Sequence, residues 1–514
     1  MSEFKLLIDT NVFIGLEDSK RVDPVSAEIV RKCGEHAVSV FVHDAALLDI
    51  SRDKDHIRRD ISLSKMRKFQ ELKGPKLPDQ PALEALFGPI RKVNDQVDVA
   101  LLYALHLNVV DLLITEDQGV HGRVKLTPLA SRVLTVADAL VWLRRTFDPT
   151  PVGFPLIDDR KAHEIDQDDN IFDSLRDGYP DFDGWWAKCV REHRRCWTVT
   201  VDDELAGLIV RKDESREESG VVLPGAKILK ICTFKVRPEF RGEKLGELLL
   251  KQALWFAQRN GYDLTYVTTY SDQDTLIRLL EYYGFIHTGS RTDGEMVFEK
   301  PLSRTRLALD SSSGDLFTTT RMNYPRFIAD PPAKVFCIPI RGDYHQKLFP
   351  ELAFGTPLPL FPQENPLLTT GGERTPGNTI RKVYLCRAKT KRLEPGDLLL
   401  FYQSKTEGLL ASQAITSVGV VERVSQTCEL DELLRLTAKR SVFSEAELRV
   451  MVEASTTPVR VIDFLLVGHL EPAVPLATLK AEGVFNGGPP QSICALTPKR
   501  FAPIRMRLDF GFEV

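Results

Sequence analysis

A basic, glycine-containing turn at residues 236–246, VRPEFRGEKLG, is the feature that most restricts how this chain can fold. The run before it, KILKICTFKV (227–236), is rich in β-branched and aromatic residues and predicts a buried strand. The run after it, ELLLKQALWFAQRNG (247–261), has apolar residues at helical spacing and ends on a glycine typical of helix caps. A turn from strand to helix offers an anion backbone N–H groups and the positive end of the helix dipole. The sequence therefore predicts a pyrophosphate site, and with it an enzyme that uses a diphosphate cofactor.

Length and composition are those of a soluble protein with several domains. The chain has 514 residues, and a prior of roughly 150 residues per domain predicts about three domains. Apolar residues make up 43% of the sequence and charged residues 27%, as in ordinary globular proteins. The formal net charge of −4 argues against a globally basic nucleic-acid binder, although not against local basic patches.

Cysteine spacing and hydropathy indicate a cytoplasmic location. The eight cysteines are scattered and form no CxxC pair, which predicts reduced thiols rather than disulfides or a zinc site. The N-terminus, MSEFKLLIDT, has no signal-peptide pattern, and polar residues interrupt the longest apolar stretch, at 99–114. We therefore expect a cytoplasmic protein without a membrane-spanning segment.

Four stretches of different character follow one another along the chain, which predicts a multidomain α/β protein. Residues 1–147 alternate strand-like and helix-like runs, the pattern of a parallel α/β sandwich. Residues 156–301 predict a mixed α+β unit with a hairpin at CWTVTV-DDE-LAGLIV. Residues 302–331, with SSSGD and TTT, predict a linker. In residues 332–514, short apolar runs between Pro- and Gly-rich loops predict a small β-barrel.

Four aspartates in the first stretch fall where predicted strands end or helices begin: Asp9, Asp49, Asp98 and Asp117. Because the carboxyl ends of parallel strands share one edge, we expect these side chains to converge in one crevice. Carboxylates that repel one another favour a hard divalent cation, Mg²⁺ or Mn²⁺, which can activate water for phosphodiester cleavage. Each aspartate taken alone is better explained as a capping or turn residue, so the prediction depends on the set.

These residues carry a resemblance to a known family. LLIDTNVFI (6–14), DVALLYAL (98–105) and LLITED (112–117) resemble the PIN domain, a metal-dependent ribonuclease fold found in many bacterial toxins. The resemblance covers about residues 4–145 and matches Asp9, Asp98 and Asp117 to the first, third and fourth family acids. It matches Asp49 to the second acid, which is usually Glu and one methylene longer. It implies metal-dependent RNA cleavage.

Neighbouring residues fit an RNA substrate. Asn11 and Thr115 match the polar residues that support the acids in the PIN family. Residues 52–76 hold nine Lys or Arg against four Asp or Glu, and a basic surface beside the carboxylates would guide a phosphate backbone to the metal. The alternative is a solvated helix face, which charge alone favours.

A second resemblance covers residues 190–300. Residues 241–246, RGEKLG, resemble the Arg/Gln-x-x-Gly-x-Gly/Ala motif of GNAT N-acyltransferases, with Lys244 where glycine is commonest. TLIRLLEYYGFIHTG (275–289) resembles the helix–Gly-Phe–strand signature of the family at Gly284-Phe285. The resemblance implies an acetyl-CoA-dependent acetyltransferase. It also implies the following cofactor-binding residues: Phe234, Val236, Arg241, Gly242, Glu243, Lys244, Leu245 and Gly246.

The proton chemistry of this second site is less well defined by the sequence. Many members of the family use a Tyr four residues before the Gly-Phe glycine as general acid, and that position here is Leu280. Tyr282 and Tyr283 are close in sequence but lie at other angles on a helix. Either the acid is displaced, or a water serves, or the domain binds the cofactor with weak turnover. No general base is assigned.

The last stretch carries a third, weaker resemblance. FCIPIRGDYHQKLFPEL (336–352), the run at 380–404 and its PGD turn resemble an ASCH domain of the PUA-like superfamily over about residues 332–511. Such domains commonly bind RNA or modified nucleotides, and basic side chains that would do so cluster near one predicted strand. The candidates are Arg381, Lys382, Arg387 and Lys389. The alternative is a basic solvent-exposed face.

Together these observations predict a bifunctional, toxin-like enzyme. A GNAT-type N-acetyltransferase would be joined to a PIN-type endoribonuclease and an RNA-binding ASCH-type domain, with RNA (tRNA among the candidates) as partner and an antitoxin protein encoded nearby. One alternative is an acetyltransferase of protein or small-molecule amines in which the PIN-like part only binds. Another is a non-catalytic regulator that senses acetyl-CoA and RNA. Domain identity alone does not decide among them.

Overall fold

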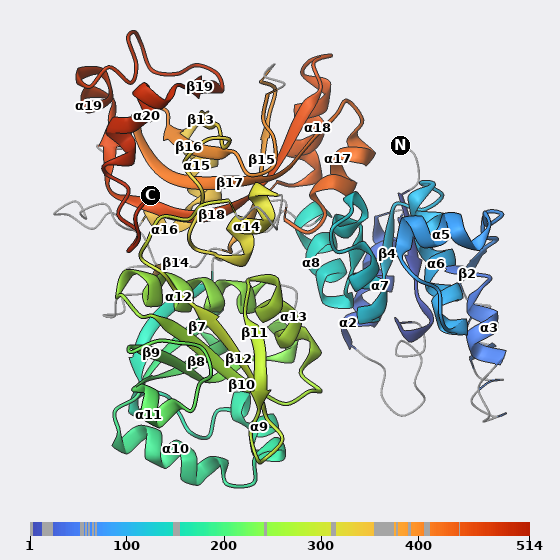
Figure 1. Cartoon of the computed structure of the whole chain (residues 1–514). Coiled ribbons are helices and arrows are strands. Elements are labelled where there is room, and N and C mark those ends of the chain that lie inside the picture. The colour runs from blue at the N-terminus through green and yellow to red at the C-terminus, as the bar shows by residue number, and fades with distance from the viewer. Residues whose placement is uncertain are drawn as a thin grey trace. The chain divides into compact units, whose positions relative to one another are not determined.

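The computed structural model describes most of the chain, and its elements are drawn in Figure 1. The described residues form two compact units, one drawn from 1–152 and 425–461 and the other from the remaining residues. The domain boundaries predicted from the sequence stay predictions. The described residues are 4–12, 24–36, 38–51, 56, 59, 62–63, 66, 69–147, 155–240, 244–309, 315–353, 375–376, 379–388, 392–405, 412–440 and 443–514.

A five-stranded parallel sheet forms the centre of the first unit, with strand order β3-β2-β1-β4-β5. Its strands are β1 (Phe4–Ile8), β2 (Val38–His43), β3 (Gln70–Leu72), β4 (Leu112–Ile114) and β5 (Val133–Leu134). β1 pairs with β2 from Phe4↔Val38 to Ile8↔Val42, so its apolar run is enclosed between neighbours. The strand order reverses between β1 and β4, and the segments that follow these two strands therefore meet at one crevice. The parallel sheet predicted from the alternating pattern is confirmed.

Helices from two distant parts of the sequence belong to this unit. Those of the N-terminal part are α2 (Pro24–Glu35), α3 (Ala46–Ser51), α5 (Gln80–Phe87), α6 (Val93–His106), α7 (Gln118–Val124), η1 (Pro128–Ser131) and α8 (Val136–Phe147). Two more come from the C-terminal part of the chain, α17 (Leu430–Thr437) and α18 (Glu445–Glu453). α18 therefore comes from the stretch predicted as a β-barrel, yet it belongs with the N-terminal residues. Arg435 of α17 forms an ion pair with Asp111 at 2.7 Å.

The second unit contains an eight-stranded sheet in the order β11-β12-β10-β9-β8-β7-β6-β14. Among its paired neighbours only β9 and β10 run parallel. The predicted hairpin is present as β7 and β8, and its turn holds Asp202 and Asp203 at positive φ. The strands are β6 (Leu156–Lys161), β7 (Arg195–Val201), β8 (Glu204–Glu214), β9 (Ile228–Val236), β10 (Leu264–Thr269), β11 (Ile286–Ser290), β12 (Met296–Pro301) and β14 (Thr375–Pro376).

Helices cover both faces of this sheet (Figure 1). On one face, α12 packs its leucines against strand residues such as Val199 and Ile231. On the other face, Phe182 and Trp186 of α10 pack against Leu208 of β8. The helices are η2 (Ala162–Glu164), η3 (Asn170–Phe172), α9 (Asp173–Gly178), α10 (Phe182–Arg191), α11 (Arg216–Ser219), η4 (Pro238–Phe240), α12 (Leu245–Arg259) and α13 (Asp274–Tyr282).

The segment predicted as a linker is instead part of the core over much of its described length. It contains α14 (Leu316–Met322), and Phe317, Tyr324 and Phe327 are buried. Asp315 caps α14 by accepting hydrogen bonds from the N–H groups of Phe317 and Thr318. The polar residues that suggested a linker therefore include the N-cap residue of a helix. Asp, Ser and Thr are favoured both in loops and at helix N-caps, so their presence does not distinguish the two.

A six-stranded sheet forms the rest of the second unit, in the order β15-β18-β17-β16-β13-β19. It shares one hydrophobic core with the eight-stranded sheet, through residues that include Leu254 of α12 and Val467 of β18. Strand pairing places β15 and β19 at the edges, and the predicted barrel closure stays a prediction. The elements are β13 (Val335–Ile340), α15 (Gly342–Leu348), α16 (Pro350–Ala353), β15 (Arg381–Cys386), β16 (Leu398–Gln403), β17 (Ala414–Thr427), β18 (Val459–Pro475), α19 (Leu476–Ala481), β19 (Cys494–Leu496) and α20 (Pro498–Arg505).

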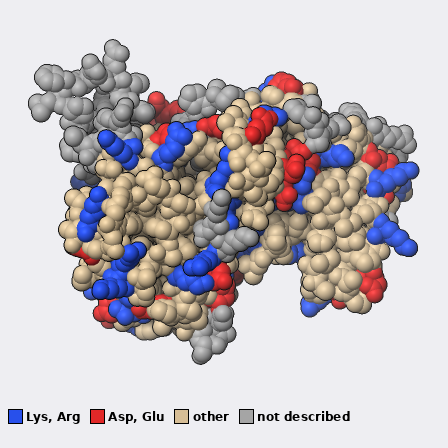
Figure 2. All heavy atoms as spheres, turned by 90° about the horizontal axis from the view of Figure 1, so that it is seen from above, with Lys and Arg blue, Asp and Glu red and all other residues tan. Residues whose placement is uncertain are grey.

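Surface and hydropathy add two observations. On the face shown in Figure 2, lysine and arginine side chains are spread among acidic and neutral ones. Within the described residues, no helix combines the length and the apolar character needed to cross a bilayer.

Candidate functional site

A gap opens in the eight-stranded sheet where its two parallel strands separate. β9 and β10 pair from Leu264↔Ile228 to Val267↔Ile231. Both strands continue beyond this point, β9 to Val236 and β10 to Thr269, but the pairing recorded for the described residues ends at Ile231. Backbone groups on the facing edges of the two strands are therefore left for another partner.

A β-bulge in β9 lies at the start of the gap. Val210 of β8 faces Thr233, whereas the next residue, Arg211, faces Ile231, so Cys232 is an extra residue in β9. A bulge bends its strand and increases the local twist. The bulge thus accounts for the departure of β9 from β10 at this residue.

Strand alternation shows which backbone groups face the gap. The N–H of Arg237 donates to the carbonyl of Ala206 at 2.9 Å, so this pair is of the hydrogen-bonded type. Hydrogen-bonded and non-hydrogen-bonded pairs alternate along an antiparallel ladder. Lys235 therefore directs its backbone groups to β8, whereas Phe234 and Val236 direct theirs to the gap. Both were predicted to bind cofactor, and that assignment stays a prediction.

The N-terminus of α12 follows β9 closely in the sequence. α12 has 15 residues, and its N-cap residue Lys244 makes no side-chain cap. The N–H groups of Leu245 and Gly246 lie in the first turn, where a helix has no internal acceptor and its dipole favours an anion. Lys244 has φ 61°, a left-handed conformation that glycine adopts most easily, which gives a physical reason for glycine to be common there. Arg241, Gly242 and Glu243, also predicted to bind cofactor, lie outside the described residues.

Comparison with known proteins identifies this part of the chain. Residues 160–285 match the profile of the acetyltransferase (GNAT) family. The chain therefore contains a GNAT acetyltransferase domain. No curated protein matches the chain.

Several solved structures are similar to parts of the chain. A GNAT-family acetyltransferase from Streptococcus agalactiae is 18% identical over 30% of this chain and 99% of its own, with a TM-score of 0.24. The NatC complex bound to Gag peptide and CoA is 20% identical over 21% of this chain and 71% of its own, with a TM-score of 0.18. A point mutant of the ZmASCH protein from Zymomonas mobilis is 13% identical over 33% of this chain and 96% of its own, with a TM-score of 0.22.

The Gly-Phe signature of the acetyltransferase domain has a steric explanation. Gly284 has φ 83°, and a Cβ there would overlap the carbonyl oxygen of Met322. Only glycine fits this close approach between the end of α13 and α14. Leu280, at the position of the usual general acid, is fully buried in the core.

The two tyrosines next to Leu280 are engaged elsewhere. Arg321 and Arg381 lie over the ring of Tyr282, with cation-to-centroid distances of 4.4 and 5.1 Å. Tyr283 is fully buried, and its hydroxyl has no hydrogen-bond partner among the described residues. Burial, and then the nearby Glu247, raise the pKa of Tyr283 well above its ordinary value. Tyr282 thus contacts residues that follow the acetyltransferase domain and Tyr283 is enclosed in the core, and neither is assigned as the general acid.

On the sheet face opposite α12, the end of β10 beside the gap and its neighbour β12 carry residues that the sequence did not single out. Thr269 of β10 pairs with Met296 of β12, so the next residues along, Tyr270 and Glu295, are cross-strand neighbours. Glu295 accepts a hydrogen bond from the hydroxyl of Tyr179 at 3.1 Å. The rings of Tyr179 and Tyr270 lie 5.4 Å apart. Finding this group required the register of β10 and β12, which the sequence pattern does not give.

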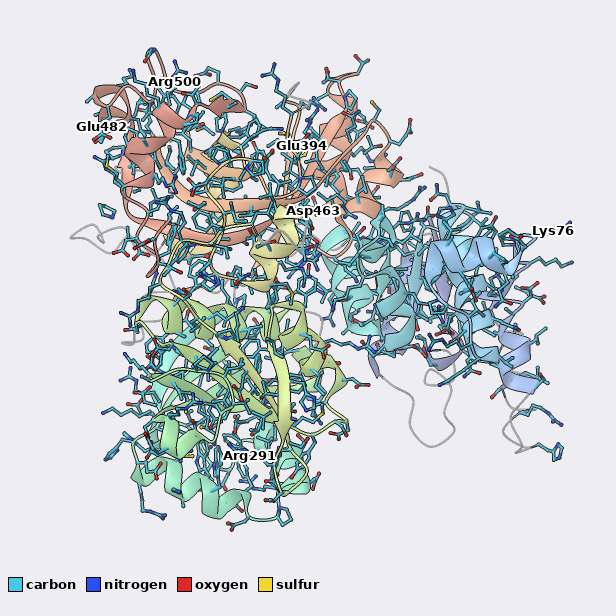
Figure 3. The ribbon with its side chains drawn as sticks, viewed as in Figure 1. Lys76, Arg291, Glu394, Asp463, Glu482 and Arg500 are labelled. Carbon is cyan, nitrogen blue, oxygen red and sulfur yellow. The ribbon has the colours of Figure 1, made fainter. Side chains whose placement is uncertain are left out.

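Charged groups of both signs lie on the same face of the sheet as these tyrosines. Burial, and then Glu295, raise the pKa of the Tyr179 hydroxyl, so it stays protonated. Lys235 of β9 donates to Ser174 of α9 at 2.5 Å on the same face. Arg291, labelled in Figure 3 in the β11–β12 turn, lies near the ring of Tyr266. This face of the sheet therefore carries charged groups of both signs.

In the first unit, two of the four predicted acids lie close to the switch point of the parallel sheet. Asp9 follows β1, and its carboxylate accepts hydrogen bonds from Thr115 Oγ1 at 2.6 Å and from Asn11 Nδ2 at 3.0 Å. Asp117 follows β4 and caps α7, accepting from the N–H of Gly119 at 2.5 Å. The polar neighbours Asn11 and Thr115 thus hold Asp9 as the sequence predicted.

The four aspartates influence one another electrostatically. Burial, and then the charges of Asp117 and Asp9, raise the pKa of Asp98 to about 7. Burial is also the main reason that the pKa of Asp9 is raised, with smaller contributions from Asp117 and Asp49. Thr10 Oγ1 donates to Asp49 at 3.4 Å. Oxygen ligands suit Mg²⁺ or Mn²⁺, but within the described residues no group of three His, Cys, Asp or Glu is arranged to hold a metal ion.

Two further acids near this crevice, Asp95 and Glu116, have structural roles. Asp95 accepts from the N–H groups of Arg91 and Lys92 and so caps α6. Glu116 accepts from the N–H of Val136 at 2.8 Å. Among the nine basic residues of 52–76, the structure describes Arg59, Lys73 and Lys76, and the others lie outside the described residues.

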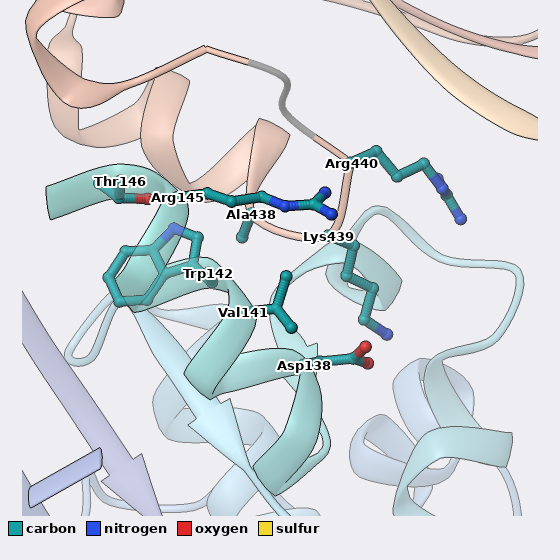
Figure 4. Close-up of a pocket in the computed structure, with 8 residues that line it drawn as sticks. All are labelled: Asp138, Val141, Trp142, Arg145, Thr146, Ala438, Lys439 and Arg440. Carbon is teal, nitrogen blue, oxygen red and sulfur yellow. The ribbon is translucent and has the colours of Figure 1, made fainter. Parts of the chain in front are cut away.

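A shallow pocket of this unit lies between α8 and residues 438–440 (Figure 4). Trp142 and Arg145 of α8 line it, together with Arg440. In Figure 4 the side chain of Lys439 points towards Asp138. The pocket is lined by none of the four predicted acids.

The predicted RNA-binding residues are largely engaged within the second unit. The guanidinium of Arg381 pairs with Glu422 and lies over Tyr282. Lys382 is buried and Arg387 is half-buried. Lys389 lies outside the described residues. This arrangement places the charge of Arg381 against a carboxylate rather than on an open surface.

Proposed function

We propose that the chain is an acetyl-CoA-dependent N-acetyltransferase whose reaction centre is the gap between β9 and β10. The observation that carries this proposal is the separation of the two strands beyond Ile231, with the backbone groups of Phe234 and Val236 directed into the gap. The GNAT profile match at residues 160–285 supports it independently.

The residues present fit the cofactor. Acetyl-CoA would supply an activated acetyl thioester. Phe234 and Val236 offer backbone donors to its carbonyl oxygens, and the first turn of α12 offers N–H groups to its pyrophosphate. Lys244 adds positive charge near the start of that turn.

The amine acceptor would enter from the face that carries Tyr179, Tyr270 and Glu295. Glu295 is a carboxylate one strand away from the gap, next to Tyr270, and is suited to hold an ammonium group and to take its proton. The two tyrosine rings offer faces for a cation or an apolar stem. These features favour an amine with an additional polar or charged group, from a small molecule or from a protein.

A backbone-directed variant tests the proposal. The full chain is incubated with acetyl-CoA and a panel of primary amines, and release of the CoA thiol and acetylated product are measured. Phe234→Pro removes one N–H aimed into the gap without removing a ladder hydrogen bond to β8. Loss of one such donor costs about a hundredfold in kcat or more. Phe234→Leu keeps that N–H and an apolar side chain, and we expect it to stay within about twofold of the wild type.

Two results would oppose the proposal. One is an equal loss of activity in both variants, which would assign the effect to packing of the Phe234 side chain. The other is the absence of both CoA binding and thiol release in the wild-type chain with every amine.

A second candidate function is metal-dependent RNA cleavage by the N-terminal unit. It is favoured by the mutual repulsion among Asp9, Asp98 and Asp117, which a divalent cation would relieve. RNA would then be a partner of the chain, and a toxin-like role with an antitoxin encoded nearby is the corresponding biological proposal. The acetyltransferase proposal does not depend on it.

The nuclease proposal has its own test and control. Total RNA is incubated with the full chain and Mn²⁺, and we expect cleavage that Asp9→Asn abolishes. Asp95→Asn changes a neighbouring acid that caps α6 and pairs with Arg123, and it should leave cleavage in place. RNA that stays intact with the wild-type chain, or equal loss in the two variants, rejects a catalytic role for this crevice.

A further inference from the structure

In several helices of this chain an acidic residue at the third position caps its own helix. Asp95 of α6 accepts from the N–H of Lys92 at 2.8 Å. Glu218 of α11 accepts from the N–H of Ser215 at 3.0 Å, and Glu447 of α18 accepts from the N–H of Ser444 at 2.9 Å. In each case the side chain returns to the N-cap residue and occupies the anion-binding end of the helix.

The cofactor-binding helix is different. Glu247 is the third residue of α12, after Leu245 and Gly246, yet no capping box forms at Lys244. Its carboxylate Oε1 instead accepts the backbone N–H of Arg381 at 2.6 Å. Arg381 is the first residue of β15, in the six-stranded sheet, 134 residues further along the chain.

The donor is held in place by several contacts. The guanidinium of Arg381 pairs with Glu422 of β17 and lies 5.1 Å from the ring centroid of Tyr282. The carbonyl of Ile380, the preceding residue, accepts from the N–H of Leu466 at 2.7 Å. The start of β15 is therefore fixed against its own sheet and offers its N–H to Glu247 at a defined position.

Further contacts follow along the same face of α12. Lys251 pairs with Glu351 at 3.2 Å, and the indole N–H of Trp255 donates to the hydroxyl of Tyr324 at 2.7 Å. Glu247, Lys251 and Trp255 are spaced four residues apart, so they lie on one side of the helix. The six-stranded sheet and its flanking segments thus hold the helix that carries the proposed pyrophosphate site.

These contacts decide which anion occupies the end of α12. A glutamate at the third position would otherwise return to the N-cap, satisfy its N–H and place a negative charge where the pyrophosphate binds. We propose that the backbone N–H of Arg381 is a positioning group of the acetyl-CoA site, which holds the Glu247 carboxylate away from the helix end and leaves that end to the pyrophosphate. This proposal rests on the acetyltransferase function proposed above.

Replacing Glu247 by two different residues tests the idea. Glu247→Asp is one methylene too short for the contact with Arg381 but can cap α12, as Asp95 caps α6. We expect it to bind CoA about fivefold more weakly, which corresponds to about 1 kcal/mol at about 1.4 kcal/mol per tenfold change in Kd. Glu247→Ala removes the competing carboxylate and should bind CoA at least as tightly as the wild type. Titration calorimetry of the full chain with CoA measures both.

A second pair of variants addresses the donor. Arg381→Pro removes the N–H at the first residue of a strand, where proline is tolerated. We expect the same loss of about fivefold in CoA affinity, since the freed Glu247 then caps α12 at a cost of about 1 kcal/mol to the ligand. Adding Glu247→Ala to Arg381→Pro should restore binding. Glu281→Asp, an exposed acid on α13, is the matched control and should leave CoA affinity unchanged.

The outcomes separate the two proposals. If the wild-type chain does not bind CoA, the acetyltransferase proposal fails. If it binds CoA and Glu247→Asp and Glu247→Ala bind equally well, the positioning role of Arg381 is wrong. A loss in Arg381→Pro that Glu247→Ala does not restore also rejects it, since the loss would then come from the sheet rather than from the carboxylate.

Discussion

The buried ion pair between Lys251 and Glu351 makes a strong prediction about stability. The side chains are 5% and 11% exposed, the charged atoms lie 3.2 Å apart, and His469 Nε2 lies 2.8 Å from the same carboxylate oxygen. At an effective dielectric constant of about 20, two charges at this distance attract by about 5 kcal/mol. Most of that attraction offsets the cost of removing both charges from water.

Removing one partner should therefore be costly, and removing the second partner as well should add less than its own single loss. We expect Lys251→Met to lower the free energy of unfolding of the second unit by about 3 kcal/mol, because Glu351 is then a buried charge that has lost its cation. Glu351→Gln should cost a similar amount. In the double variant the two losses should not add, and a coupling energy of about 2 kcal/mol is expected.

Urea denaturation followed by tryptophan fluorescence measures these values. Trp255 is a suitable reporter because the ammonium of Lys251 lies 4.8 Å from its ring centroid. Lys334→Met is the matched control, because Lys334 and its partner Glu394 are 49% and 66% exposed. Exposed pairs contribute about 0–1 kcal/mol. Equal effects of Lys251→Met and Lys334→Met, or strictly additive losses in the double variant, would refute the reasoning.

The same pair implies a pH dependence. Although burial raises it, the charges of Lys251 and then His469 hold the pKa of Glu351 below its usual range. The unfolded chain therefore binds a proton at higher pH than the folded chain does. The stabilising contribution is complete above the ordinary value of 4.5 and is lost as the pH falls below it.

Three further predictions concern single buried groups. Burial lowers the pKa of Lys300 to about 7 from 10.5, so the free energy of unfolding should rise with pH between these values, and Lys300→Met should flatten that part of the pH profile. Gly284→Ala should destabilise the second unit by about 3 kcal/mol in urea, because the new methyl group meets the Met322 carbonyl at positive φ, and equal stability would contradict the close approach. Because the pKa of Asp98 is raised to about 7, its burial and repulsion destabilise the first unit fully only above pH 7. Asp98→Asn should therefore stabilise that unit at pH 8 and have little effect near pH 4, as thermal unfolding at the two pH values can show.

Local patterns in the sequence were sufficient for several elements. The alternation of apolar and polar runs predicted the parallel sheet of the first unit, because a strand buried on both faces must be continuously apolar. The runs on either side of the turn at 236–246 predicted a strand and a helix, since each depends on residues adjacent in sequence. The Gly-Phe pair at 284–285 was also visible, and the structure adds the steric reason for its glycine.

Composition was a poorer guide where one residue type serves two purposes. Asp315 and the threonines after it suggested a linker, but they begin a helix whose Phe317 is buried. Arg381 suggested an exposed RNA contact, but its guanidinium pairs with Glu422. Polar residues suit both caps and loops, and arginine suits both surfaces and buried pairs, so only their neighbours in space distinguish the roles.

The sequence by itself determined that the turn at 236–246 ends in a helix whose first residues can bind an anion, because helix and strand formation there depend on local spacing. Only the tertiary structure decided whether the Glu247 carboxylate competes with a bound anion for that helix end. The contact between Glu247 and the N–H of Arg381 joins residues 134 positions apart, and no local rule relates them. Likewise, Tyr179, Tyr270 and Glu295 meet only because strand register and a distant helix end bring them to one face of the sheet. Register and packing are properties of the whole fold, which is why the chemistry they create could not be read from the turn itself.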